Sequence, residues 1–437
     1  MKCFKICIFL FLFLGCNIET SNYSNVIIIM SDDLGYGGIG SYGNKQILTP
    51  NLDFLANNGI KFNDFHSNGT VCTPTRSSLI TGLYPQKTGL EGVIYAKGET
   101  RNYGLDPKFT TIADVFKENN YKTAIVGKWH LGYDPKFNPT NFGFDQFYGY
   151  VSGNIDFHTH RDGAGYHDWY HNKKKVIENG YSTDLITKHS ANFISQNKNK
   201  PFFLFVSHEA PHVPFQGRND PGFRFSPEDS DYYGPVKDKV RAYKEMVEIM
   251  DEGIGVIINT LKKNQLLEKT MIFFMSDNGA REFGHNGELR GEKGSLFEGG
   301  IRVPAIAYWK SMIESKVSNE LLITFDLFPT LISILNLKNY QKTLDGLDFS
   351  EILFSNEKLI KDRKLFWRYR GDKVFRNKKY KLMLTDNDTL LFDMENDISE
   401  KNNLKHEKKY LIDNYIKEII DWESEISDYP VITNGYP

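Results

Sequence analysis

Four segments of the chain share one plan, in which a continuous apolar run ends in a cluster of polar residues. The runs are NVIIIM (25–30), YKTAIV (121–126), PFFLFV (201–206) and MIFFM (271–275). Such runs are typical of strands that are buried on both faces, as in parallel sheets. Helical patterns lie between them, at 111–119, 182–196 and 240–262. This alternation predicts an α/β fold with a large, doubly wound, mainly parallel sheet flanked by helices.

The polar clusters point to a single site. They are SDDLG (31–35), GKWHLG (127–132), SHEAPH (207–212) and SDNG (276–279). In doubly wound sheets the ligand crevice lies beyond the carboxyl ends of the strands, so these distant segments are expected to meet there. The candidate metal ligands offer oxygen atoms, which suit Ca²⁺, or Mg²⁺, rather than Zn²⁺: Asp32, Asp33, Asp277 and Asn278. Each motif alone also fits a plain turn, but each ends a strong strand pattern.

The last hundred residues change character. Alternating patterns at 364–369, 373–384 and 389–392 are separated by turn residues, and a helical pattern follows at about 407–426. This predicts a small C-terminal antiparallel sheet with a packed helix. We therefore expect a catalytic domain at 16–345 and a small α+β domain at 346–437.

The N-terminus reads as an export signal. Lys2 and Lys5 precede an apolar run at 7–14, and Gly15 precedes Cys16. The pattern predicts a lipoprotein signal peptide at 1–15 and a lipid anchor on Cys16, in the periplasm or on the outer membrane or cell surface of a bacterium. An ordinary signal peptide is the alternative. No later apolar run is long enough to span a membrane, and the net charge of -2 gives no electrostatic case for nucleic acid.

The cysteines single out one residue. The chain has four: Cys3, Cys7, Cys16 and Cys72. Cleavage would remove the first two, and lipid would occupy Cys16. Cys72 is then alone in an exported protein, where disulfide pairing is the default. A lone thiol in that setting favours a chemical use for Cys72.

Cys72 opens the motif CTPTR (72–76), followed by TGLYP at 81–85. Further motifs are DDLG (32–35), GKWHLG (127–132), DNG (277–279), and GEKG (291–294) with FEGGIRVP (297–304). In their order along the chain, these motifs resemble those of the type I, formylglycine-dependent sulfatases of the alkaline phosphatase superfamily, and in particular of bacterial polysaccharide sulfatases. The resemblance covers about residues 24 to 400.

The resemblance implies an enzyme that hydrolyses sulfuric esters. A maturation enzyme would oxidise Cys72 to formylglycine (3-oxoalanine), whose hydrate is the nucleophile and a metal ligand. Arg76 would anchor this residue, and Lys128 and Lys293 would bind the sulfate. His130 would act as a base. The proton donor would be His208 or His212; the alignment is ambiguous, and we favour His208 slightly.

A surface lipoprotein of this family would act on a sulfated carbohydrate. Marine algal glycans such as ulvan or carrageenan fit, and glycosaminoglycans are possible. The loop FHTHRDGAGYHDWYH (157–171) is rich in histidine and aromatic residues. It predicts a substrate-recognition loop, although an ordinary surface loop fits equally well and a transition-metal site is a third reading. Candidate substrate contacts are His158, His160, Arg161, His285, Asn286 and Arg290.

Two rival functions stay open. A phosphatase or phosphonate hydrolase on the same fold would usually need two metals and more His or Asp ligands than the motifs offer. An inactive glycan-binding lipoprotein is disfavoured because no core motif residue is missing.

Overall fold

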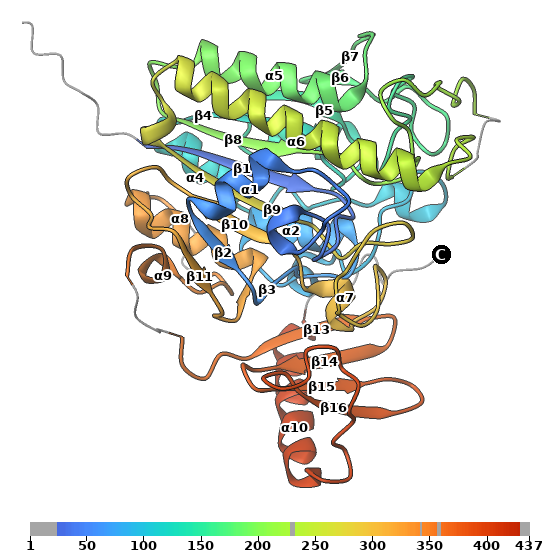
Figure 1. Cartoon of the computed structure of the whole chain (residues 1–437), viewed down its shortest axis with the longest axis vertical. Coiled ribbons are helices and arrows are strands. Elements are labelled where there is room, and N and C mark those ends of the chain that lie inside the picture. Colours follow the sequence, from blue (N-terminus) through green and yellow to red (C-terminus); the bar gives the residue numbers. More distant parts are fainter. Residues whose placement is uncertain (1–23, 228–231, 341–342, 356–359, 429–437) are drawn as a thin grey trace, which may run out of the picture.

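The computed structural model describes residues 24–428 apart from 228–231, 341–342 and 356–359. The predicted signal peptide and Cys16 lie outside the described residues. The centre of the molecule is a ten-stranded sheet in the order β11-β2-β10-β9-β1-β8-β4-β5-β6-β7 (Figure 1). Among the described residues, none of the helices combines the length and the apolar character needed to cross a membrane.

The four predicted runs form neighbouring parallel strands of this sheet. They are β1 (Asn25–Ser31), β4 (Lys122–Lys128), β8 (Phe202–Ser207) and β9 (Thr270–Ser276). β1 lies between β8 and β9, and β4 pairs with β8 on one side and with β5 (Gln146–Tyr150) on the other. The predicted fold class is confirmed.

Antiparallel and short strands extend this parallel core on both sides. β10 (Ala305–Tyr308) runs antiparallel to β9, and β2 (Ile60–Phe62) runs antiparallel to β10. The remaining short strands are β3 (Phe65–His66), β6 (Tyr170–His171), β7 (Lys174–Lys175), β11 (Lys316–Ser318) and β12 (Leu322–Ile323). The sheet is therefore mixed, with a parallel centre.

Alternate residues of β1 pack into two different cores, one on each face of the sheet. Ile27 and Ile29 contribute to the core beneath α5 (Ser182–Gln196) and α6 (Lys239–Lys263), which run side by side in Figure 1. Val26 and Ile28 contribute to the opposite core. Helices on that face include α4 (Ile112–Glu118) and α8 (Leu327–Leu335). Two covered faces explain why the strand sequences are continuously apolar.

The other helices are short, except for the last. They are α1 (Pro50–Asn57), α2 (Cys72–Thr81), α3 (Pro85–Thr88), α7 (Glu298–Ile301), α9 (Ser350–Phe354) and α10 (Lys409–Ile426).

The C-terminal part is the predicted small antiparallel sheet with its helix. The strands, in order, are β13 (Leu365–Tyr369), β14 (Asp372–Arg376), β15 (Tyr380–Leu384) and β16 (Thr389–Asp393). The segment predicted at 373–384 is two strands, because Asn377 accepts hydrogen bonds from the backbone of Lys379 and Tyr380 and closes a turn.

The C-terminal module, made of β13 to β16 and α10, packs against the large domain through a shared hydrophobic core. Trp367 and Trp422 pack with Val71, next to Cys72, and with Leu296. Figure 1 shows the module below the α7 region. Phe349, which precedes α9, and Ile352 and Leu353 within it pack in the core of the large sheet.

Candidate active site

The strand-end clusters meet at one edge of the sheet, as predicted. Asp32 follows β1, Lys128 ends β4 and Asp277 follows β9, and all three are fully buried. Lys128 forms an ion pair with Asp32 through its Nζ and Oδ2 atoms. Arg76 reaches over from α2 and donates through Nε and Nη2 to Asp277 Oδ2, at 3.1 and 2.9 Å. Residues from distant parts of the chain are thus bound into one charged site.

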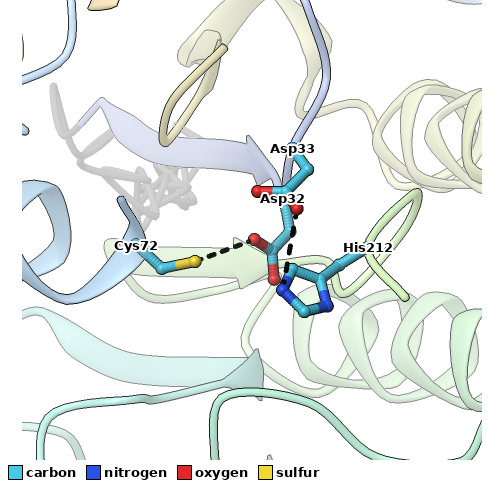
Figure 2. Close-up of side chains that lie close together, drawn as sticks. All are labelled: Asp32, Asp33, Cys72 and His212. Carbon is cyan, nitrogen blue, oxygen red and sulfur yellow. Dashed lines mark hydrogen bonds and ion pairs between the residues drawn. The ribbon is translucent and has the colours of Figure 1, made fainter. Parts of the chain in front are cut away.

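Cys72 is the first residue of α2 and is only 2% exposed. Its Sγ donates to Asp32 Oδ1 at 3.3 Å, as Figure 2 shows, and lies 3.5 Å from Lys293 Nζ. Burial and the neighbouring Asp32 carboxylate raise the pKa of the Cys72 thiol. The thiol is therefore protonated near neutral pH and is a poor nucleophile in this state.

The carboxylates at this edge are crowded. Burial would raise the pKa of Asp33, but Lys293 and His212 outweigh it and lower the pKa. Lys293 Nζ lies 2.7 Å from Asp33 Oδ1, and His212 Nε2 lies 3.6 Å from Asp33 Oδ2 (Figure 2). Burial and the nearby Asp32 raise the pKa of Asp277 to about 6, and they outweigh the opposite effect of Arg76 and Lys128.

A buried acidic cluster at this edge could hold a metal ion. One ligand atom each from Asp32, Asp33, Cys72 and His212 lies within 4.8 Å of the others. Asn278 Nδ2 donates to Asp33 Oδ1 at 2.7 Å, but Asn278 Oδ1 is buried with no hydrogen-bond partner among the described residues. An unpaired buried oxygen next to crowded carboxylates is what a hard metal ion would satisfy.

His130 lies at the same edge, in a left-handed backbone conformation with φ of 57°. Its Nε2 hydrogen-bonds the carbonyl oxygen of Ile94 at 2.9 Å, so Nε2 carries the proton and Nδ1 is left with a free lone pair. Burial and Lys128 lower the pKa of His130, which keeps the ring neutral. A neutral ring of this kind can accept a proton.

The two candidate proton donors lie in different places. His212 lines the active-site cavity, and its Nδ1 bonds the carbonyl oxygen of Val213 at 2.7 Å. His208 is fully buried, and neither of its ring nitrogens has a partner among the described residues. Burial lowers the pKa of both rings, that of His208 to about 3 and that of His212 well below its usual value, so only the place of each ring separates them: His208 is absent from the described cavity lining. The cavity lining therefore favours His212 over His208 as the proton donor, and this role stays a prediction.

The site opens into a cavity of about 560 Å³. Cys72, His130, His212 and Lys293 line it, together with Tyr95, Tyr133, Tyr232 and Tyr369. Arg76 and Lys128 are not part of the described lining. Arg76 donates hydrogen bonds to Asp277 and Ser207, and Lys128 forms an ion pair with Asp32. Sulfate binding by Lys128 stays a prediction, whereas Lys293 is in position to meet a ligand.

The predicted substrate residues of the histidine-rich loop bond backbone carbonyl oxygens and lie outside the described cavity lining, so their role stays a prediction. His158 Nε2 and His160 Nε2 bond the carbonyl oxygens of Gly217 and Gly180, at 3.2 and 3.0 Å. Arg161 donates to Gly165 O at 2.8 Å. None of the three is part of the described cavity lining, and the loop contributes Gly163 there. The transition-metal reading gains no support, since the possible metal groups found among the described residues lie elsewhere.

The other predicted substrate residues also act within the fold. His285 Nδ1 accepts from the backbone of Gly287, and Asn286 Oδ1 accepts from the backbone of Ala280 at 2.9 Å. Arg290 donates to Glu400 O at 2.9 Å and lies over the ring of Phe297. The charged residues that line the outer part of the cavity are instead Lys97, Arg281 and Arg370. They were not predicted from the sequence, because no local motif marks them.

Comparison with known proteins identifies the family. A family model described as "Sulfatase" matches residues 24–337. The chain belongs to the sulfatase family. Arylsulfatase A of Bos taurus is 30% identical over 413 residues, which cover 84% of this chain and 76% of the relative. N-acetylgalactosamine-6-sulfatase of Canis lupus familiaris is 31% identical over 383 residues, or 80% of this chain and 69% of the relative.

A solved structure shares the fold of this chain. The crystal structure of Ps i-CgsB in complex with k-i-k-neocarrahexaose superposes with a TM-score of 0.83 at 30% identity and covers 95% of both chains. As a member of the sulfatase family, this protein is an enzyme that hydrolyses sulfuric esters.

Proposed function

We propose that this sulfatase removes sulfate ester groups from a sulfated polysaccharide or its oligosaccharides, with Cys72 converted to formylglycine as the nucleophilic residue. The position of Cys72 carries the proposal. It lies at the start of α2, between Asp32 and Lys293, and it lines a cavity. Formylglycine, once formed and hydrated, would supply a hydroxyl that attacks sulfur and a second hydroxyl that later releases sulfate.

We propose that Asp32, Asp33, Asp277 and Asn278 hold one Ca²⁺, with Mg²⁺ as the alternative. The unpaired Asn278 oxygen and the crowded carboxylates support this. The ion would supply positive charge beside the sulfate oxygens and favour the ionised nucleophile.

The residues of the chain have separate tasks in this reaction. The Lys293 ammonium, 3.5 Å from Cys72 Sγ, offsets the negative charge of the sulfate. An anion bound in the cavity favours the protonated form of His212, which can then donate a proton to the leaving alcohol with help from Lys293. His130, with its free Nδ1, takes a proton from the nucleophilic residue. Arg76 positions Asp277.

The substrate class follows from chemistry and from the relatives. We propose a marine algal glycan such as carrageenan or ulvan, because a structural neighbour at 30% identity binds k-i-k-neocarrahexaose. A glycosaminoglycan is the second candidate, since a curated relative is named an N-acetylgalactosamine-6-sulfatase. We also propose export as a bacterial lipoprotein anchored through Cys16, with a formylglycine-generating enzyme as partner.

Sulfate and phosphate release from matched aryl esters tests the activity. Protein made together with the maturation enzyme should release sulfate and little phosphate, and the Cys72→Ala variant should release neither. Faster phosphate release would favour the phosphatase reading. Full activity of Cys72→Ala would exclude Cys72 as the nucleophilic residue, and no release from any ester would favour the inactive glycan-binding reading.

A further inference from the structure

Three positively charged side chains line the active-site cavity and take no part in the reaction proposed above. They are Lys97, Arg281 and Arg370, which we name the outer cations. Lys97 and Arg370 are exposed and Arg281 is half-buried, whereas Cys72 and His212 are buried. The outer cations therefore face a part of the ligand that lies on the solvent side of the scissile group.

The outer cations come from three unrelated segments. Lys97 lies in the loop after α3, Arg281 follows β9, and Arg370 lies in the turn between β13 and β14. None of the described residues that line the cavity is an aspartate or a glutamate. The whole chain carries 53 basic and 55 acidic residues, so this local excess of positive charge does not reflect the composition. Such a cleft concentrates anions.

Two of these cations are available to a ligand. Within the described parts of the chain, neither Lys97 nor Arg281 forms a salt bridge, and the Arg281 guanidinium lies 5.9 Å from the centre of the Tyr232 ring. A guanidinium group matches two oxygens of a sulfate or carboxylate at once. The cavity, at about 560 Å³ and with four tyrosine rings, also has room for more than one sulfate group.

We propose that the outer cations bind a second anionic group of the glycan, on or beside the sugar that carries the scissile sulfate. The enzyme would then select polyanionic glycans over those with a single sulfate. The inference rests on the proposed function, because it assigns a further contact to the same substrate.

Three oligosaccharides with one backbone test the inference: one with a single sulfate, one with a second sulfate, and one with a uronate in place of the second sulfate. The readout is kcat/KM for sulfate release, expressed as the ratio to the single-sulfate compound. We expect a ratio well above one for at least one of the two anionic compounds. The compound with the larger ratio identifies the second anion as sulfate or carboxylate.

Variants then assign the effect to side chains. Arg281→Gln should lower the ratio about tenfold, the value of one charge-assisted contact, and Lys97→Gln and Arg370→Asn should lower it less. Asparagine is chosen at position 370 because Arg370 has φ of 52°, which asparagine tolerates. Lys200→Gln is the matched control, because this exposed lysine precedes β8, at the opposite end of the strand from the site. Its ratio should equal that of the wild type.

Two results would overturn the inference: a ratio near one for both anionic compounds, or variants that lose activity equally on all three compounds. Failure of the proposed function looks different, since no compound and no aryl sulfate would then release sulfate.

Discussion

Loss of the buried cation Lys381 should strongly destabilise the protein. It is fully buried on β15, where its Nζ lies 2.9 Å from Glu298 Oε1 and 2.8 Å from Glu400 Oε1. Burial would raise the pKa of Glu298, but Lys381, His66 and Arg376 outweigh it and hold the pKa well below its usual value. The contact joins the C-terminal module to α7, close in sequence to Lys293.

The magnitude follows from the charge balance of this buried ion cluster. The cluster contains three carboxylates and three cations. The carboxylates are Asp64, Glu298 and Glu400, and the cations are Arg302, Arg376 and Lys381. Lys381→Met keeps the length of the side chain but leaves one buried carboxylate uncompensated. Breaking a buried ion pair in this way costs about 3–5 kcal/mol, which is a large part of the 5–15 kcal/mol typical of a folded domain.

Urea titration followed by tryptophan fluorescence measures this loss, because Trp367 and Trp422 are buried in the module. Lys379→Met is the control, since Lys379 pairs with Glu395 at 3.6 Å on an exposed surface, and this substitution should cost far less stability than Lys381→Met. Adding Glu400→Gln to Lys381→Met should recover part of the loss by removing a carboxylate left without its cation. A loss for Lys381→Met no larger than for Lys379→Met would refute the reasoning.

Three further predictions concern pH, metal and catalysis. Burial lowers the pKa of His160 from 6.5 to about 4. Below pH 6.5 the His160 ring binds a proton in the unfolded chain but stays neutral in the folded chain. The free energy of unfolding should therefore fall toward pH 4, by at most about 3 kcal/mol. His160→Gln should flatten this slope in urea titrations, and an unchanged slope would contradict the assignment. Ca²⁺ added after EGTA treatment should raise the melting temperature of the wild type but not of Asp33→Asn; equal shifts would argue against the metal site. Lys293→Met should lower kcat for an aryl sulfate about 100-fold or more, and a wild-type kcat would remove Lys293 from the mechanism.

The sequence predicted the parallel centre of the fold because four long apolar runs have few alternatives to buried strands. It also predicted that their polar ends meet, since the carboxyl ends of parallel strands share one edge. The short strands on one side of the sheet were not predicted: β2 and β11 have three residues each, which is too short for a periodic signal. Their pairing depends on long-range contacts.

The outer part of the site was less predictable. The loop at 157–171 suggested ligand contacts because it is rich in histidine, but His160 is used inside the fold, where it bonds Gly180 and stacks on Trp169. Arg370, in contrast, lies in an ordinary hairpin turn. It reaches the cavity only because the C-terminal module packs beside Cys72, and no local pattern encodes that packing.

The most direct test of the central claim is the mass of the peptide that contains Cys72, taken from protein made together with a formylglycine-generating enzyme. The account predicts a peptide with an aldehyde in place of the thiol, and sulfate release in proportion to the converted fraction. A fully unmodified thiol in protein that releases sulfate at the same rate would contradict it.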